Sequence, residues 1–227
     1  FAKLKAQGIL LDPEGRKAAI RDQVLKMIAG VNGQEKIDED LLDEVNQLVE
    51  APTALLGSFE KEHLVLPPEV LISVMKKHQR YFPVIGKDGK LLPHFIAVRN
   101  GDKQGLDLVT DGNEQVIRAR FADANFFIHE DLKHKLSDLL EKLGTLTFQQ
   151  KLGSMLDKSV RVTKMVQQLA PQIGLSADEQ KTALRAAELC KADLVSHMVV
   201  EMTSLQGVMG RYYAEHSGEG KDVAQAI

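Results

Sequence analysis

The hydrophobic pattern predicts helices at both ends of the chain, with strands between them only in the first half. Asp12-Pro13 is typical of a helix start, and Gly30 ends the apolar run that follows it. Asp38 is suited to cap a second helix, which Pro52 closes. The inner faces of these helices are expected at Ile20, Val24, Met27 and Ile28, and at Leu41, Leu42, Val45, Leu48 and Val49.

Residues 55–128 combine strand and helix patterns. Leu55–Phe59 predicts a short strand, and Pro67-Pro68 predicts the start of a helix with Val70, Leu71, Val74 and Met75 inside. The β-favouring runs 81–85 and 91–98 flank Gly86-Lys-Asp-Gly-Lys90, which predicts a hairpin. A further helix is expected from about residue 113 to 128.

After Glu130 only helical patterns remain. Residues 132–143 are amphipathic, and Met155, Val162, Val166, Leu169 and Ile173 form one stripe in which Pro171 predicts a kink or an early end. Ser176 and Glu179 form a capping box for a long helix with Ala183, Ala187, Cys190, Leu194 and Met198 inside. We therefore expect an α+β fold, with a mixed domain at residues 1–131 and an all-helical domain at 132–227.

Composition places the chain among ordinary globular proteins. It has 227 residues, 44% of them hydrophobic and 27% charged, and a net charge of −3, which argues against a charge-driven nucleic-acid binder but permits local basic surfaces. The single cysteine fits a reducing compartment, and neither a signal peptide nor a membrane-length apolar run is present, so we expect a cytoplasmic protein without membrane contact. Because the chain starts at Phe1, we expect a piece of a longer protein.

No pattern of catalytic residues stands out. There is no nucleophile–base pair and no glycine loop for phosphate, and His129 and His134 have the wrong spacing for one helix face. Asp193, His197 and Glu201 are spaced by four and would share a stripe of the long helix. Such a trio can hold a metal or perform acid–base chemistry, but a solvated, hydrogen-bonded stripe is the simpler interpretation. We expect no catalytic residue and no metal ligand.

Basic residues gather in three places. Residues 76–80 are basic at a helix end, where the helix dipole alone can account for them. Arg118 and Arg120 point to different helix faces, so one can meet a phosphate while the other pairs with Asp123 or Glu114. Lys151, Lys158 and Arg161 fall near one helical face, and Tyr212 or Tyr213 are preferred over Phe126 and Phe127 as stacking residues. These features favour a binding module.

Five long blocks, in order along the chain, resemble the β subunit of the bacterial two-subunit glycyl-tRNA synthetase. They are Met75-Lys-Lys-His-Gln-Arg-Tyr-Phe-Pro83, residues 113–127, Lys151-Leu-Gly-Ser154, residues 185–194 and residues 205–214. The resemblance implies that an α subunit carries the active site with ATP and Mg²⁺, that this piece holds no cofactor, and that the β subunit grips tRNA(Gly) in an α2β2 complex. The residues then expected to bind tRNA are Lys77, Arg80, Arg118, Arg120, Lys151, Lys158, Arg161, Lys191, Arg211 and Tyr212.

The helical second half also resembles the HD superfamily, whose active members bind metal. Lys158 takes the position of the first histidine, and Cys190-Lys191 takes that of the His-Asp pair. A protonated lysine cannot serve as a ligand, so the resemblance implies a fold re-used without phosphohydrolase activity. Two alternatives stay open: an HD-type phosphohydrolase with Asp193, His197 or Glu201 as ligands, and a scaffold that never touches RNA.

Overall fold

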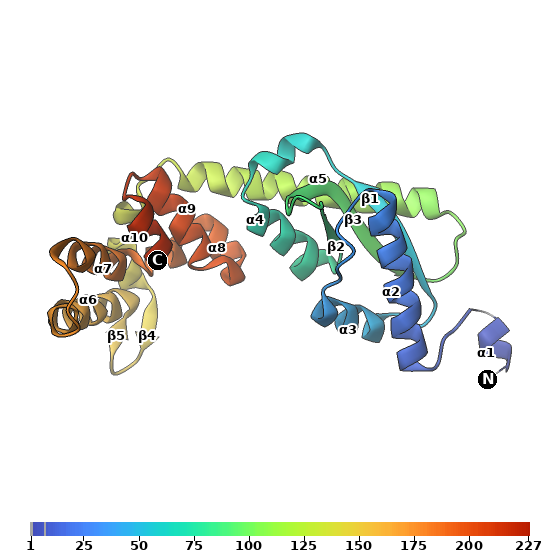
Figure 1. The fold of residues 1–227 in the computed structure, drawn as a ribbon, viewed down its shortest axis with the longest axis horizontal. Helices are drawn as coiled ribbons and strands as arrows, with labels where there is room; N and C mark the ends of the chain where they lie inside the picture. Colours follow the sequence, from blue (N-terminus) through green and yellow to red (C-terminus); the bar gives the residue numbers. More distant parts are fainter. Residues whose placement is uncertain (1, 7) are drawn as a thin grey trace. The chain divides into compact units, whose positions relative to one another are not determined.

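The first half of the chain builds a three-stranded antiparallel sheet in the computed structural model, which describes residues 2–6 and 8–227 (Figure 1). The strand order is β1-β3-β2, with β1 at Pro52–Ser58, β2 at Phe82–Ile85 and β3 at Leu91–Asn100. β1 pairs with β3 along its whole length, from Pro52 opposite Asn100 to Ser58 opposite His94. The predicted hairpin between β2 and β3 is confirmed.

Each face of the sheet is covered by helices. Ala54, Phe82 and Ile96 pack with helix α2 (Pro13–Gly30) and helix α3 (Glu39–Leu48) in one apolar core. Phe95 points to the other face, because successive side chains of a strand alternate, and its ring stacks on Tyr81 at 4.7 Å. Tyr81 donates through its hydroxyl to Asn113 Oδ1 of α5 at 2.7 Å, which joins α5 to this face.

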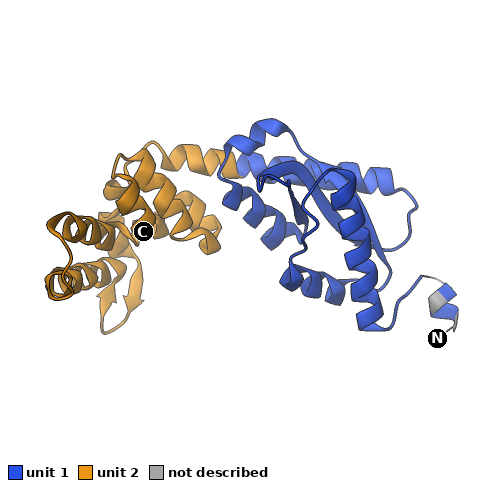
Figure 2. Cartoon of the chain, viewed as in Figure 1, with its two compact units in different colours: residues 1–123 blue, residues 124–227 orange. Residues whose placement is uncertain are grey.

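The remaining elements of the first half are short, except for α5. They are α1 (Ala2–Ala6), the 3₁₀ turn η1 (Lys61–Val65), α4 (Pro68–Ser73) and the π-helical turn η2 (Val74–His78). Helix α5 runs from Leu106 to Asp131, longer than the predicted 113–128, and it belongs to both of the compact units into which the chain divides, residues 1–123 and 124–227 (Figure 2). The domain boundary predicted after residue 131 lies at the end of this same helix.

The second unit is mostly helical but contains a small hairpin. Its helices are α6 (Met155–Gln172), α7 (Ala177–Leu189), α8 (His197–Glu201), α9 (Val208–His216) and α10 (Lys221–Ala226). Its 3₁₀ turns are η3 (Leu136–Leu139) and η4 (Glu141–Thr145) between α5 and β4, η5 (Ala192–Val195) between α7 and α8, and η6 (Thr203–Leu205) between α8 and α9. Strands β4 (Thr147–Gln149) and β5 (Gly153–Ser154) pair in an antiparallel hairpin that precedes α6 (Figure 1).

The α+β class is confirmed, but several local predictions for the second half are wrong. The absence of strands after Glu130 is contradicted by β4 and β5, and residues 132–143 form 3₁₀ turns instead of a continuous amphipathic helix. The long helix from Ser176 ends at Leu189, although its capping box is present. Helix α6 ends directly after Pro171, as expected for an early stop.

Three apolar residues assigned to inner helix faces are exposed instead. Leu48, Leu169 and Ile173 are 60%, 48% and 70% exposed. Each stands in the last turn of its helix or just beyond it, where neighbouring elements no longer cover the helix.

Of the helices in the described part of the chain, none has both the length and the apolar character needed to cross a bilayer.

Candidate nucleic-acid interface

The basic residues at the end of the α4–η2 helix are partly neutralised by α3. Lys76 forms an ion pair with Asp38, and Arg80 Nε donates to Glu44 Oε1 at 2.7 Å. Arg80 has φ +54°, the left-handed conformation that ends many helices and turns the chain into β2. Lys77 is exposed on the same turn. Of the two residues predicted to bind tRNA here, Lys77 is the one without an ion pair among the described residues.

Arg118 and Arg120 lie on different faces of α5, as their spacing predicted. Arg118 Nε donates to Glu60 Oε1 at 2.6 Å, and this hydrogen bond lowers the pKa of the Glu60 carboxyl. The predicted partners, Asp123 or Glu114, are therefore wrong for Arg118, and Glu114 instead accepts from the backbone and hydroxyl of Ser58. Arg120 is exposed. The sequence could not reveal Glu60, since it precedes Arg118 by 58 residues.

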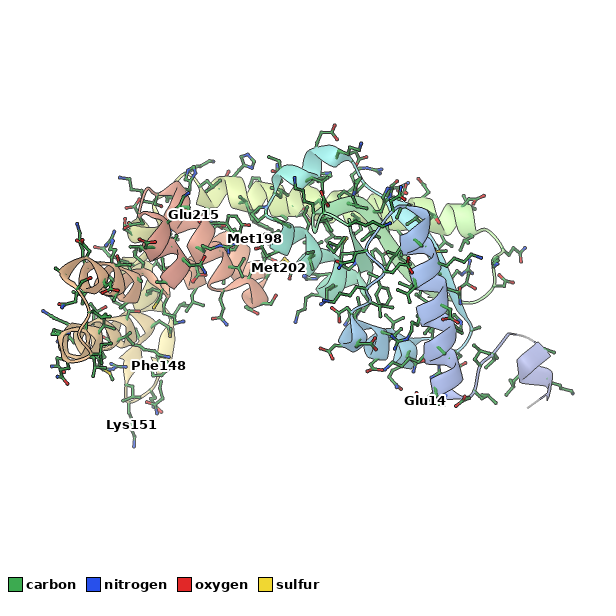
Figure 3. All side chains as sticks on the ribbon, viewed as in Figure 1. Glu14, Phe148, Lys151, Met198, Met202 and Glu215 are labelled. Carbon is green, nitrogen blue, oxygen red and sulfur yellow. The ribbon has the colours of Figure 1, made fainter. Side chains whose placement is uncertain are left out.

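In the second unit, the β4–β5 hairpin carries one basic residue and is fastened to α6 by two others. Lys151 lies in the turn of the hairpin and projects at its end, so its predicted place on a helix is wrong (Figure 3). The amide nitrogen of Lys151 donates to Gln149 Oε1, which closes the turn. Lys158 Nζ stands 4.1 Å from the centre of the Phe148 ring, and Arg161 donates to the Leu152 carbonyl at 2.9 Å. The three residues thus surround one hairpin.

The start of α6 is fixed by its own cap. Ser154 Oγ accepts from the Asp157 amide, and the Asp157 carboxylate accepts in return from the Ser154 backbone and side chain, which lowers the pKa of that carboxyl. Because the cap fixes the first turn, Lys158 and Arg161 are held on a defined face beneath the hairpin. The hairpin residue Phe148, 38% exposed, was missed by the sequence interpretation, which saw no strand there.

Lys191 lies on a different element from the hairpin group. It directly follows Cys190, the C-cap residue of α7, and precedes η5. Burial raises the pKa of the Cys190 thiol, while the charges of Lys191 and Lys158 lower it.

The trio Asp193, His197 and Glu201 does not share a helix stripe, because the helix ends before Cys190. Asp193 lies in η5 and is 1% exposed, and its Oδ2 accepts from the amides of Gly207 and Gly210. Burial raises its pKa. His197 is the first residue of α8, where its backbone and its ring Nδ1 both bond Asp131 Oδ1 at 2.8 Å. Nowhere in the described residues do three His, Cys, Asp or Glu side chains come together as a metal-binding group.

Asp131 is a buried hub that no sequence pattern singles out. It ends α5, is 6% exposed, and receives the amides of His197 and Met198 as well as the hydroxyl of Tyr213. Tyr213 is 3% exposed, and its pKa is raised mainly by burial, so of the two tyrosines considered for stacking on bases Tyr212 stays the candidate. On the same helix, Arg211 lies over the ring of Tyr212, with 4.8 Å between guanidinium and ring centre.

Of the two phenylalanines considered for stacking on bases, Phe126 is the more exposed, at 59%, and its ring lies edge-on to the ring of Phe127. The preference for Tyr212 or Tyr213 over this phenylalanine pair stays a prediction, with Tyr213 buried. Exposure depends on which helix face is covered, and the sequence pattern of paired aromatics is the same in both places.

A cleft of about 420 Å³ lies in the first unit, beside the edge strand β2. Its lining is mainly aliphatic, and the Lys76–Asp38 ion pair stands at its polar side. This lining combines no nucleophile with a base, so the cleft fits an apolar group better than a reacting one.

The predicted tRNA-binding residues therefore fall into two sets. Lys77, Arg80, Arg118 and Arg120 belong to the first unit, whereas Lys151, Lys158, Arg161, Lys191, Arg211 and Tyr212 belong to the second. Within the second unit, the structure gathers Lys151, Lys158 and Arg161 around the hairpin and Lys191 beside Cys190. Their binding to tRNA stays a prediction.

Comparison with known proteins gives the family. The model of the family described as glycyl-tRNA synthetase beta subunit matches residues 1–227. The chain is 50% identical over 227 residues to the glycine–tRNA ligase beta subunit of Synechocystis sp., covering 100% of this chain and 31% of that protein. It is also 50% identical over 225 residues to that of Bacillus subtilis, covering 99% and 33%. The chain thus spans about a third of the length of these relatives, and it belongs to the glycyl-tRNA synthetase β subunit family.

Proposed function

We propose that this chain is the part of a glycine–tRNA ligase β subunit that binds and positions tRNA(Gly), while ATP-dependent glycylation takes place on the α subunit. The names of the relatives and the family match support the ligase and the two-subunit organisation. We further propose an α2β2 complex in the cytoplasm, with ATP and Mg²⁺ bound by α. The charge and aromatic character of the second unit supports the contact with RNA.

The observation that carries this proposal is the group of basic side chains around the β4–β5 hairpin. Lys151 and Arg161 are exposed, and Lys158 lies against the exposed ring of Phe148. Ammonium and guanidinium groups bind backbone phosphates, and an aromatic ring offers a surface to an unstacked base. Phosphate contacts of this kind position an RNA, whereas base or 2′-hydroxyl contacts would be needed to identify it.

The test uses the intact two-subunit enzyme and the salt dependence of its affinity for tRNA(Gly). Lys151, Lys158, Arg161 and Lys191 are replaced together by alanine. The plot of log affinity against log salt should become shallower by roughly 0.7 to 0.9 for each phosphate that the variant no longer neutralises. A control with the same charge change replaces four exposed lysines of the same unit, Lys142, Lys164, Lys181 and Lys221. An affinity and slope equal to those of the control would rule out RNA binding by this surface.

Two other functions are separated by direct experiments. For a scaffold without RNA contact, photocrosslinking of tRNA to the intact enzyme would give no crosslinks within residues 67–214. For an HD-type phosphohydrolase, purified protein would contain stoichiometric metal and would hydrolyse phosphate esters. The separation of Asp193 from His197 on different elements weakens the second alternative, because its proposed ligands no longer share one helix face.

The HD-like relationship of residues 132–227 is part of the proposal. Lys158 near the start of α6 and Cys190-Lys191 just beyond the end of α7 are the residues aligned with the metal ligands of that superfamily. The lysines would then supply positive charge where active relatives hold a cation.

A further inference from the structure

Helix α6 carries an apolar stripe that the other elements of the second unit leave largely uncovered. Its residues are three or four positions apart and therefore share one helix face: Val162, Met165, Leu169 and Ile173. The last three of these side chains are between 48% and 70% exposed. The buried residues of α6, Ser159 and Ala170, lie about a quarter turn away around the helix axis. The apolar face of α6 is thus wider than the face that this unit covers.

The stripe has the length and the spacing of a contact between two helices. It begins at the hairpin, where Lys158, one turn before Val162, lies over the Phe148 ring. From Lys158 to Ile173 it extends about 22 Å, at 1.5 Å per residue. Apolar residues at i, i+3 and i+7, as at positions 162, 165 and 169, are the anchors through which one helix packs on another. Single exposed apolar residues are ordinary, but contiguous ones mark a protein contact.

One edge of the stripe is basic. Arg161 and Lys164 each precede a stripe residue by one position, and both are exposed. Neither forms an ion pair with another described residue of the second unit. The one acidic residue of α6, Asp157, caps the start of the helix. Two copies of α6 packed antiparallel would bring their basic edges together, where they repel, whereas a helix with an acidic edge would be attracted.

We propose that the α6 stripe holds an amphipathic helix with acidic residues along one edge, and that the rest of the β-subunit polypeptide supplies this helix. In the relatives, about two thirds of the polypeptide lies outside the part that matches this chain. A segment of the same polypeptide is present at high effective concentration, so it needs less intrinsic affinity than a separate partner. The inference depends on the family and not on tRNA binding, and an RNA backbone gains no phosphate contact from an apolar stripe.

The first test is photocrosslinking in the intact two-subunit enzyme. A benzophenone amino acid replaces Met165 in the full-length β subunit, and mass spectrometry identifies the attached peptide. The peptide should come from a helix of the same β subunit outside residues 1–227 and should contain Asp or Glu beside its apolar face. The matched control places the same amino acid at Val160, which is 46% exposed on the opposite face of α6 and should not reach that peptide.

Glutamate substitutions then measure how strongly the stripe holds the helix. L169E puts a charge into the stripe, and V160E puts the same charge at a similarly exposed position on the opposite face. Because L169E loses one leucine from the contact, the amides of the crosslinked helix should exchange at least about tenfold faster in L169E than in V160E. K164E should speed this exchange by about two- to fivefold, and K181E on α7 should leave it unchanged.

The identity of the crosslinked peptide decides the inference. A peptide from the α subunit, from residues 1–123 or from tRNA refutes the proposed occupant. So does a mixed-isotope crosslink in enzyme assembled from labelled and unlabelled β subunits, because it reveals a second copy. Equal crosslinking from positions 160 and 165, or none from position 165, refutes the docking surface, as does equal exchange in L169E and V160E. Crosslinking at Met165 needs neither glutamate variant, so a folding defect in one of them leaves this test intact.

Discussion

Asp131 joins α5 to the rest of the second unit, and its replacement by asparagine should weaken that connection selectively. Its carboxylate accepts from the first two amides of α8, His197 at 2.8 Å and Met198 at 3.0 Å, and from the Tyr213 hydroxyl at 2.7 Å. These groups need an acceptor, because the first amides of a helix have no partner within it. A carboxylate supplies two acceptor oxygens, and an asparagine supplies one.

The expected loss follows from these contacts. A hydrogen bond to a charged group contributes about 1.5–3 kcal/mol and a neutral one about 0.5–1.5 kcal/mol, while a buried donor left without a partner costs about 1–3 kcal/mol. In D131N, the surviving hydrogen bonds are weaker because the asparagine side chain is uncharged. Its NH2 group also replaces one acceptor oxygen and therefore faces donor groups of the protein. Together these effects should lower the local stability by about 3 kcal/mol. Since about 1.4 kcal/mol corresponds to tenfold, opening of α8 should become roughly a hundredfold more frequent.

Hydrogen exchange measured residue by residue tests this prediction. The amides of His197 and Met198 should exchange roughly a hundredfold faster in D131N than in wild-type protein. D123N provides the control, because Asp123 is an exposed residue about two turns earlier on the same helix. If both amides exchange equally fast in D131N and D123N, Asp131 does not hold α8, and the account of this hub is refuted.

Two further predictions concern packing and acid stability. A Cβ at Gly57 would lie 2.7 Å from Phe95 Cε1, whereas one at Gly112 in α5 meets nothing within 4 Å. G57A should therefore lower the free energy of unfolding by about 1–3 kcal/mol, and G112A should raise it by about 0.5–1 kcal/mol. Urea unfolding measures both changes, and equal changes in the two variants would contradict this packing. The hydrogen bond from Arg185 lowers the pKa of Glu219, so the pair contributes stability above the unfolded pKa that is lost as pH falls through the folded pKa. E219Q should lower the free energy of unfolding by about 1 kcal/mol at neutral pH, and its stability should fall less steeply than that of the wild type below about pH 4.5. Parallel plots of unfolding free energy against pH for the two proteins would disprove a contribution from this ion pair.

Local sequence signals were sufficient where a helix cap or a turn fixes the backbone by itself. Asp38 accepts from the Leu41 amide as its cap position predicted, and the Gly86–Lys90 segment closes the β2–β3 hairpin. These interactions join residues close along the chain, so the sequence contains both partners. The same reasoning located the capping box at Ser176 but not the end of the helix it begins.

The partners of functional side chains were decided by the tertiary structure. Asp131 binds residues 66 and 82 positions later, and Arg118 pairs with a glutamate 58 positions earlier. The sequence by itself determined the α+β class, the charges that are present and the resemblance to a family. Which charges are neutralised, as Arg118 is by Glu60, and which lie against a ring, as Lys158 does against Phe148, depends on packing that brings separate segments together. Hydrophobic periodicity cannot encode that choice, because it reports which face of an element is buried and not which element buries it.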